Sequence, residues 1–422
     1  MKVSIIGSAF SGNRGAAAML ESSIAHLTEQ EPDVDIVHLS MYPKSDADLN
    51  IHSNVRVMDA SPLRLGVAIN GGALLWRLVP PARSAIRRFV PEVGEIADSD
   101  VLLDQGGITF VDGREKYLIY NVASILPALN VKTPVVKCAQ ALGPFEGTLN
   151  RTLAKVYLPK VAAIISRGAI THSHLASLRL SNVTAGADMA FTLDVTPRDE
   201  ELAAQAIPSG FFADGDVVGY SPSQVLRESA AKKGDDYVAE VVRHIDHLTE
   251  TMGRKVFLVA HSTRPNPEKT HNNDLPVCRE ILAHVASPEK VAFTDAELTP
   301  GALRALIGQC DLFVASRFHA MVSSLAMSVP TLVLGWSHKY REVLDQVDQA
   351  AWAMSASDVT IESFAERMTE LDDAKAEIRA VLSTKVPEVR TTAMEQFAVI
   401  GRVARLGAAA VRGAVKGATG RA

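Results

Sequence analysis

Short apolar runs alternate with helical patterns along almost the whole chain, and this alternation restricts the fold more than any other feature. Runs rich in Val, Ile and Leu favour strands, whereas longer stretches with apolar residues every three or four positions favour helices. The strand-like runs are residues 3–6, 35–39, 101–103, 135–138 and 163–166 in the first half, and 217–220, 256–259, 291–293, 312–315 and 331–334 in the second. The helical patterns include residues 16–28, 117–129, 237–250, 276–284 and 300–308. Such alternation predicts parallel sheets covered by helices, an α/β fold.

The length of the chain predicts two domains. Its 422 residues exceed what one hydrophobic core usually organises. A polar segment that carries Pro197, Pro208, Gly210 and Gly215 is the best seam. Each side can hold a doubly wound sheet, so we expect an N-terminal Rossmann-like domain at 1–205 and a C-terminal one at 206–400, which face a central cleft that holds the active site. Residues 401–422 are expected to form a basic tail rich in Ala and Gly.

Composition excludes several classes of protein. The net charge is −5, so no global positive field points to nucleic acid. The three cysteines are far apart in the sequence, which argues against a disulfide framework or a zinc site and suits a reducing cytoplasm. His172 and His174 have no third ligand at a convincing spacing, so no metal site is expected.

Two basic segments bear on membrane contact. The long apolar run at 63–79 is interrupted by Arg64, Asn70 and Arg77, so a transmembrane helix is not expected. Residues 76–89 carry four arginines among apolar residues and are either ordinary surface or a surface-lying, lid-like segment. The tail has five basic residues and no acid, and is either a frayed end or a basic helix on an anionic membrane.

An arginine and a histidine stand where a strand-like run gives way to a helical one. Ser316, Arg317 and His319 follow residues 312–315, and the next residues are apolar at helical spacing. Ligands of open α/β sheets bind beyond the carboxyl ends of strands, and the start of a helix favours an anion. Arg317 can hold a carboxylate or phosphate through two donors, and His319 can transfer a proton near neutral pH. The alternative is a helix cap whose arginine pairs with an aspartate.

Glycine loops follow strand-like runs of the first half. Asn13, Arg14 and Gly15 end the loop that begins at Gly7, and the pair Gly106-Gly107 follows residues 101–103. Glycines permit a tight turn and a close approach of a ligand to backbone N–H groups. The first loop lacks the Lys-Ser/Thr of a nucleotide-binding P-loop, which excludes that motif. The alternative for each loop is a turn needed only for packing.

The second half has polar residues at the predicted ends of further strands. Ser221 follows residues 217–220, His261 follows 256–259, and Lys339 lies shortly after 331–334. Together with the segment of Arg317 and His319 they form a polar and basic edge. His261 and Lys339, taken alone, are more often incidental than functional.

These residues resemble the polysaccharide pyruvyl transferase family over about residues 1 to 350. The specific block runs from Asp311 through Arg317 and His319 to Lys339. Weaker matches are the loop at 12–16, Gly106-Gly107, Gln140 with Gly143-Pro144, Arg167 after a strand, Asp188-Met-Ala-Phe191, Tyr220-Ser-Pro222, His261 and Asn273-Asp274. The chain departs from the family at Ala16, where many relatives have an acid, and at Met189 in place of a proline.

The resemblance implies a two-domain fold like that of glycosyltransferase-B enzymes. It also implies transfer of the enolpyruvyl unit of phosphoenolpyruvate to a sugar of a cell-surface polysaccharide or its lipid- or nucleotide-linked precursor, often as a ketal. By position, Arg317 and His319 would bind the anion and move protons, and Lys339 would contact phosphate or carboxylate. Arg167, His261, Ser316 and Ser221, with the glycine loops, would bind substrate.

We therefore predict a transferase with phosphoenolpyruvate as donor and no resident cofactor. It would be cytoplasmic, with possible peripheral contact with the inner face of the membrane. One alternative is a nucleotide-sugar-dependent glycosyltransferase of the same fold, which would also need basic residues for a diphosphate. The other is a non-catalytic sugar-binding protein of a polysaccharide pathway.

Overall fold

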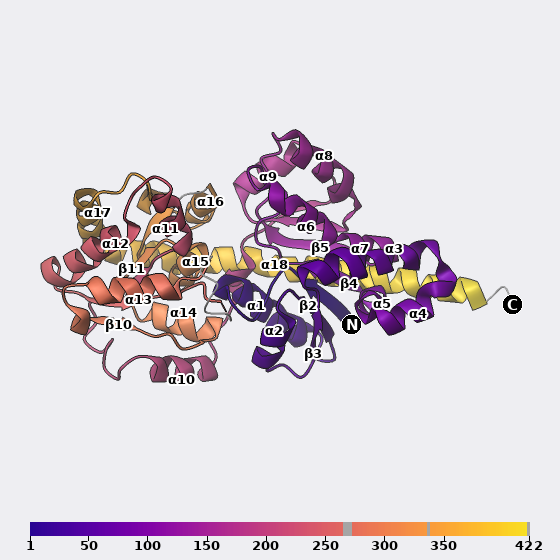
Figure 1. Cartoon of the computed structure of the whole chain (residues 1–422), viewed down its shortest axis with the longest axis horizontal. Helices are drawn as coiled ribbons and strands as arrows, with labels where there is room; N and C mark the ends of the chain where they lie inside the picture. Colours follow the sequence, from indigo (N-terminus) through magenta and orange to yellow (C-terminus); the bar gives the residue numbers. More distant parts are fainter. Residues whose placement is uncertain (265–271, 336–337, 420–422) are drawn as a thin grey trace. The chain divides into compact units, whose positions relative to one another are not determined.

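The computed structural model describes residues 1–264, 272–335 and 338–419, without the side chains of 338–339 and 408–419 (Figure 1). The chain forms two compact units. The first comprises residues 1–10, 19–189 and 391–422, and the second comprises 11–18 and 190–390. These limits differ from the predicted boundaries at 205 and 400, and in addition residues 11–18 belong to the second unit.

The first unit is built on a seven-stranded sheet in the order β3-β2-β1-β4-β5-β6-β7, and every neighbouring pair is parallel. Its central strands β4 and β5 are buried along their whole length and mostly apolar, as expected where helices cover both faces. The strands are β1 (Lys2–Ile6), β2 (Asp35–Ser40), β3 (Val55–Asp59), β4 (Val101–Asp104), β5 (Val135–Gln140), β6 (Ala163–Ser166) and β7 (Val183–Ala185).

Helices connect these strands and pack a shared core that includes Ile69, Trp76, Val93 and Leu102. The long helix α1 (Arg14–Gln30) begins in the second unit and continues in the first. The others are α2 (Pro43–Leu49), the π-helix η1 (Arg64–Ile69), α3 (Asn70–Leu78), η2 (Pro80–Ala82), α4 (Arg83–Phe89), α5 (Pro91–Asp98), η3 (Glu115–Tyr117), α6 (Leu118–Ala123), α7 (Leu126–Val131), α8 (Thr148–Tyr157), η4 (Leu158–Lys160) and α9 (Ala169–Ala176).

The second unit contains a six-stranded sheet in the order β10-β9-β8-β11-β12-β13, again with every neighbouring pair parallel. The strands are β8 (Val217–Ser221), β9 (Lys255–Leu258), β10 (Val291–Phe293), β11 (Leu312–Ala315), β12 (Thr331–Gly335) and β13 (Ala353–Ser355). Its helices are η5 (Met189–Thr192) at the boundary, α10 (Pro197–Ala206), α11 (Gln224–Ala231), α12 (Tyr237–Asp246), η6 (His247–Thr251), α13 (Leu275–His284), η7 (Pro288–Lys290), α14 (Pro300–Gly308), α15 (Phe318–Ala326), α16 (His338–Gln346), η8 (Ala350–Trp352) and α17 (Ile361–Asp373).

The last helix, α18 (Lys375–Thr419), contributes to both units. In the second unit, Lys375 and Arg379 bind the Asp311 carboxylate at the start of β11, at 2.8 and 2.6 Å. In the first unit, Phe397 is fully buried, and Gly407 lies so close to the carbonyl of Asp100 that a side chain would not fit without a shift. Residues 401–419 thus continue a helix rather than begin a new element.

The predicted alternation of strands and helices is confirmed, and all ten predicted strands are present. Three strands were missed because they are short or polar: β3, β7 and β13. The helix expected at 117–129 is divided into α6 and α7.

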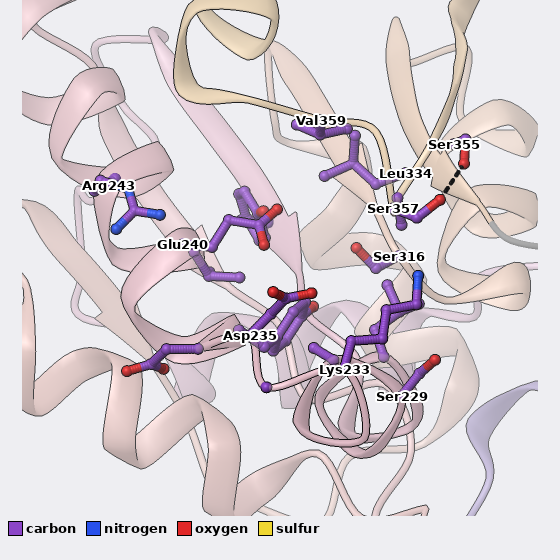
Figure 2. Close-up of a pocket in the computed structure, with 18 residues that line it drawn as sticks. Ser229, Lys233, Asp235, Glu240, Arg243, Ser316, Leu334, Ser355, Ser357 and Val359 are labelled. Carbon is purple, nitrogen blue, oxygen red and sulfur yellow. Dashed lines mark hydrogen bonds between the residues drawn. The ribbon is translucent and has the colours of Figure 1, made fainter.

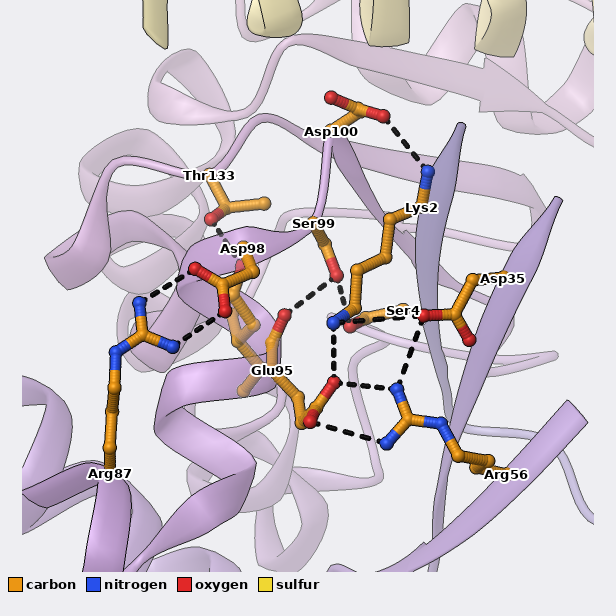
Figure 3. Close-up of polar contacts among 11 residues, drawn as sticks. Lys2, Ser4, Asp35, Arg56, Arg87, Glu95, Asp98, Ser99, Asp100 and Thr133 are labelled. Atoms are coloured by element: carbon orange, nitrogen blue, oxygen red, sulfur yellow. Dashed lines mark hydrogen bonds and ion pairs between the residues drawn. The ribbon is translucent and has the colours of Figure 1, made fainter. Parts of the chain in front are cut away.

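A polar network joins α5 to the first three strands of the sheet (Figure 3). Arg56 on β3 donates to both oxygens of Glu95 at 3.2 and 2.9 Å, and to Asp35 on β2 at 3.2 Å. Lys2 Nζ lies 2.6 Å from the Glu95 carboxylate. The hydrogen bonds from Arg56, followed by those from Lys2 and opposed by burial, lower the pKa of Glu95 to about 2.

We expect Glu95→Gln to reduce the unfolding free energy by about 1 kcal/mol near neutral pH, because the network is only partly screened by solvent. The wild-type contribution is present above the ordinary glutamate pKa of about 4.3 and is lost as the pH falls toward 2. Denaturant unfolding from about pH 7 to about pH 3 should therefore show the two proteins converging. Glu31→Gln, at an exposed position, is the control. A constant difference over this range would contradict the assignment.

Candidate functional site

The carboxyl ends of three adjacent strands carry the predicted residues of the second unit. Ser221 ends β8, His261 follows β9, and Ser316, Arg317 and His319 follow β11. Because β8 lies between β9 and β11, these residues share one edge of the sheet. The backbone N–H of Ser316 donates to the carbonyl of Ser221 at 2.9 Å. The structure therefore brings together what the sequence placed at separate strand ends.

Helix α15 starts immediately beyond this edge. Arg317 is its N-cap residue, in an extended conformation and with no side-chain capping bond. The first turn contains no acidic residue, so the N–H groups and the positive end of the helix dipole are not offset locally. The Tyr340 hydroxyl donates to the carbonyl of Ser316 at 3.1 Å, and its ring meets that of Phe318 edge-on at 5.6 Å. These contacts fix the strand-to-helix turn.

The Arg317 side chain is held by an aspartate. Its Nε donates to the two Asp274 oxygens at 3.1 and 2.9 Å, its Nη2 also pairs with Asp274, and its Nη1 donates to Asn272 Oδ1 at 2.7 Å. Burial opposes the charge of Arg317, but Asp274 outweighs it and raises the pKa of the guanidinium. The alternative of an arginine paired with an aspartate is thus what the structure shows, although the side chain of this N-cap residue makes no capping hydrogen bond. Its guanidinium is fixed in position and partly neutralised.

Asp274 joins three loops of the site. Besides Arg317, it accepts hydrogen bonds from the backbone N–H of Gln224 at 3.0 Å and of Ser262 at 2.8 Å. Gln224 begins α11 after β8, and Ser262 follows β9. The carboxylate is fully buried, so its charge must be compensated by these donors. The sequence identified Asp274 only through the family resemblance, and its central position could not be read from a lone aspartate.

The end of the N-terminal glycine loop, from residue 11 on, belongs to the second unit, whereas its beginning belongs to the first. Asn13 pairs with Ser262 in an antiparallel bridge, the Arg14 N–H donates to the carbonyl of His261 at 3.3 Å, and the Thr263 N–H donates to the carbonyl of Gly12 at 3.1 Å. The Asn13 side chain accepts from the N–H of Gly15 at 2.9 Å. Asn13, Arg14 and Gly15 therefore lie beside the loop after β9.

Gly15 lies against the ring of His319. A Cβ built at Gly15 would overlap the imidazole, so only glycine fits there without displacing the histidine. The His319 ring also meets the Phe318 ring edge-on at 4.9 Å. Gly15 is thus needed for packing, as one interpretation of the sequence held. The same packing also sets the position of the His319 ring in the candidate site.

His261 and Arg14 complete a basic cluster. Both are about 4% exposed. Burial, followed by the positive charges of His319, Arg317 and Arg14, lowers the pKa of His261 well below its ordinary value, so the ring is neutral at physiological pH. Burial also lowers the pKa of Arg14, while Glu297 raises it from 3.3 Å away. Such a cluster can bind an anion through guanidinium groups and offers imidazoles for proton transfer.

The first unit holds its own group of predicted residues. Gly106 and Gly107 follow β4, and Arg167 follows β6. Arg167 is 1% exposed; its Nε lies 3.0 Å from the Asp188 carboxylate and donates to the carbonyl of Ala139 at 3.1 Å. A Cβ built on Gly107 would lie 3.5 Å from Arg167 Nη2. The three residues are thus neighbours at one sheet edge, and Arg167 is part of a buried ion pair.

Lys339, also predicted to bind substrate, lies on α16, but its side chain is outside the described residues. Groups of His, Cys, Asp or Glu that could hold a metal ion are absent from the described part of the chain. All three cysteines are buried free thiols.

Figure 2 shows a pocket of the second unit that sequence reasoning missed. Its volume is about 750 Å³, and Ser316 forms part of its wall. Burial, opposed by Arg243, raises the pKa of Glu240 in this wall. The wall of this pocket carries charges of both signs and several hydroxyl groups. The polar wall includes Lys233, Asp235, Glu240, Arg243, Ser355 and Ser357.

Comparison with known proteins agrees with this architecture. The family model described as polysaccharide pyruvyl transferase matches residues 13–338. The amylovoran biosynthesis protein AmsJ of Erwinia amylovora is 23% identical over 414 residues, which cover 92% of this chain and 96% of that protein.

Solved structures resemble the fold at low identity. UDP-GlcNAc 2-epimerase of Neisseria meningitidis, bound to UDP-GlcNAc, has a TM-score of 0.61 at 13% identity, covering 96% of this chain and 99% of that one. UGT73P12 of Glycyrrhiza uralensis, complexed with glycyrrhetinic acid 3-O-monoglucuronide, has a TM-score of 0.58 at 10% identity, covering 100% and 99%. The predicted glycosyltransferase-B-like fold of two Rossmann-like domains is confirmed.

We expect Asp274→Asn to lower the unfolding free energy by about 3 kcal/mol, because it removes the charge that compensates Arg317 in a buried pair. Denaturant unfolding measures the change. Asp295→Asn is the control, since both side chains of the Asp295–Arg279 ion pair are exposed to solvent. This pair should contribute less than about 1 kcal/mol to the unfolding free energy. Equal losses in the two variants would show that Asp274 does not hold the site together.

Proposed function

Because the chain belongs to the polysaccharide pyruvyl transferase family, we propose that it moves the enolpyruvyl unit of phosphoenolpyruvate onto a sugar and forms a pyruvate ketal. The chain is a transferase with a role in polysaccharide synthesis. The acceptor in this proposal is a sugar of a cell-surface polysaccharide or of its lipid- or nucleotide-linked precursor. The second unit would bind the donor, and the first unit would bind the acceptor.

The contact between Gly15 and His319 carries the proposal. Through it, a loop near the N-terminus holds an imidazole beside Arg317, at the start of a helix that lacks acidic residues in its first turn. Phosphoenolpyruvate carries a phosphate and a carboxylate, so it needs fixed cations and N–H donors near a group that moves protons. Arg14 and Arg317 would supply the cations and the N-terminus of α15 the N–H donors. His319 would be the group that moves protons.

The reaction proceeds in two additions at the same carbon. A proton is added to the methylene carbon of phosphoenolpyruvate, which gives the neighbouring carbon positive charge. The oxygen of a sugar hydroxyl bonds to that carbon, and the hydroxyl gives up its proton. The bond from that carbon to the phosphate oxygen then breaks, and inorganic phosphate leaves. A second hydroxyl of the sugar bonds to the carbon and gives up its proton, which closes the ketal. One ketal and one phosphate form per phosphoenolpyruvate.

Each residue has a role suited to its surroundings. His319 would be the general acid for the methylene carbon or the base for the hydroxyl. Arg317, already oriented by Asp274, would use its remaining N–H groups to bind the carboxylate or phosphate and stabilise developing charge. The neutral His261 would accept or donate a hydrogen bond. Lys339 would provide a further contact to the anion, while Ser221, Ser316 and Asn13 would complete the wall.

In the first unit, Arg167 and the glycines 106 and 107 would shape the acceptor side. Arg167 is paired with Asp188, so it would act mainly by orienting the loop. The proposal requires no resident metal or cofactor. It places the enzyme in the cytoplasm, at the inner face of the membrane, where phosphoenolpyruvate and lipid-linked sugar precursors are both available.

Detection of phosphate by ³¹P NMR tests the donor. The protein is incubated with phosphoenolpyruvate and a panel of lipid-linked and nucleotide-linked sugars, and phosphate release that requires an acceptor is the expected result. Release of a nucleoside diphosphate from a nucleotide sugar would instead support the glycosyltransferase alternative. Saturable binding of sugars with no turnover of either donor would support the sugar-binding protein.

We expect His319→Ala to lower turnover of phosphoenolpyruvate by about 10²–10⁴-fold, because a positioned acid or base contributes that much. The phosphate-release assay measures it under saturating donor. His284→Ala is the control, because His284 is exposed on α13. Turnover of the His319 variant at the wild-type rate would remove this residue from the mechanism.

Gly15→Ala should lower turnover by about tenfold or more, since the new methyl group would displace the His319 ring and misplacement of a reacting group is costly. Gly71→Ala provides the matched control, because a Cβ at Gly71 meets nothing within 4 Å. Both variants should melt near the wild-type temperature. A Gly15→Ala enzyme with normal turnover would mean that the contact does not position the histidine.

A further inference from the structure

One helical face of the first unit leaves large apolar side chains in solvent. The π-helix η1 continues directly into α3, so residues 64–78 form one helical segment. Figure 1 shows α3, α4 and α5 grouped together. The exposed apolar side chains of this face, followed by their exposed fractions, are Leu63 (78%), Val67 (66%), Leu74 (47%), Leu75 (51%), Leu78 (64%) and Phe89 on α4 (72%).

The opposite face of the same segment is fixed in the core. Leu65, Ile69, Ala73 and Trp76 are buried in the hydrophobic cluster of the first unit. Their spacing is helical, and so is the spacing of the exposed residues Val67, Leu74 and Leu78. The segment is therefore apolar on both sides, which is unusual for a surface helix. Because one side of this segment is buried in the core, its other apolar side must contact either solvent or a binding partner.

The charges on this face all have one sign. Residues 60–91 contain five arginines and neither Asp nor Glu. Arg64 pairs with Glu92, and Arg87 with Asp98 (Figure 3), so these two charges are compensated. Within the described part of the chain, Arg77, Arg83 and Arg88 form no ion pair. Each is exposed.

Arg87 and Arg83 connect the helices of this face to one another. Arg87 Nη1 and Nη2 donate to Asp98 of α5 at 2.5 and 2.7 Å, and its guanidinium lies 5.0 Å from the centre of the Trp76 ring. Arg83 lies 5.5 Å from the same ring and donates to the carbonyl of Trp76 at 3.2 Å. The surface is thus attached to the core of the unit through Trp76.

We propose that this face, from Leu63 to Phe89, docks on the surface of an anionic lipid bilayer. Its leucines and Phe89 would enter the interface between headgroups and acyl chains, while Arg77, Arg83 and Arg88 would contact lipid phosphates. Charge complementarity favours a bilayer over a second copy of the chain, whose identical face would bring arginines together. Helices long and apolar enough to cross a membrane are absent from the described residues, so the contact is interfacial. This proposal goes beyond the transfer reaction and does not depend on it.

Vesicle flotation of the full-length protein tests the proposal. We expect binding to vesicles of phosphatidylethanolamine and phosphatidylglycerol, and little binding to phosphatidylcholine alone. The double variant Leu74→Asp, Leu78→Asp should lose at least about tenfold in partitioning, because two apolar side chains no longer enter the interface. Replacement of Arg77, Arg83 and Arg88 by Gln should weaken binding about fivefold per residue at low ionic strength and less at high ionic strength.

Leu149→Asp is the matched control, because Leu149 is 56% exposed on α8 of the same unit, and thermal melting verifies that each variant is folded. Absence of wild-type binding to anionic vesicles at low ionic strength would overturn the proposal. An equal loss of vesicle binding in the Leu149 variant would also overturn it. A third contrary result would be that the wild-type protein does not bind vesicles but is a dimer in analytical ultracentrifugation, and that the Leu74/Leu78 variant is a monomer. Binding is measured without turnover, so a failed phosphate assay would not decide this result.

Discussion

A single buried carboxylate organises the sheet edge of the second unit that carries the candidate site. Asp274 is inaccessible to solvent and is satisfied only if Arg317 and the N–H groups of Gln224 and Ser262 converge on it. Because these donors come from the loops after three adjacent strands, one charge fixes the relative position of all three. The negative charge of Asp274 also offsets part of the positive charge of Arg317. The guanidinium of Arg317 therefore points in a fixed direction in the structure without a ligand.

The second constraint is the route of the chain near its N-terminus. After β1 the chain leaves the first sheet, places residues 11–18 in the second unit, and returns along α1. This excursion brings Gly15 to His319 and the N–H of Arg14 to the carbonyl of His261. A residue near the start of the sequence thus shapes the surroundings of one more than 300 positions later. The loop acts as part of the second unit although its strand belongs to the first.

Local patterns predicted the fold well, because buried parallel strands are continuous apolar runs and the helices between them are amphipathic. Strands β3 and β7 lie at the two opposite edges of the first sheet, where burial is partial and the apolar signal is weak. Candidate residues at strand ends could be predicted because the apolar runs show where the buried strands end. An aspartate partner for Arg317 was one of the two alternatives, but that this partner is Asp274, and that residues 11–18 lie in the second unit, could not be predicted, since both depend on contacts between segments distant in the sequence.

The two imidazoles of the site have different surroundings, and this bears on their chemistry. His261 is nearly inaccessible and has cationic neighbours, so protonating it would add a buried charge beside others of the same sign. It is therefore poorly suited to donate a proton near neutral pH and well suited to act as a neutral hydrogen-bonding group. His319 is partly exposed at the start of α15 and is held by Gly15. Proton transfer to a substrate carbon requires access to substrate as well as a proton, and of the two residues His319 is the less buried, although its Nε2 atom is inaccessible to solvent in this structure.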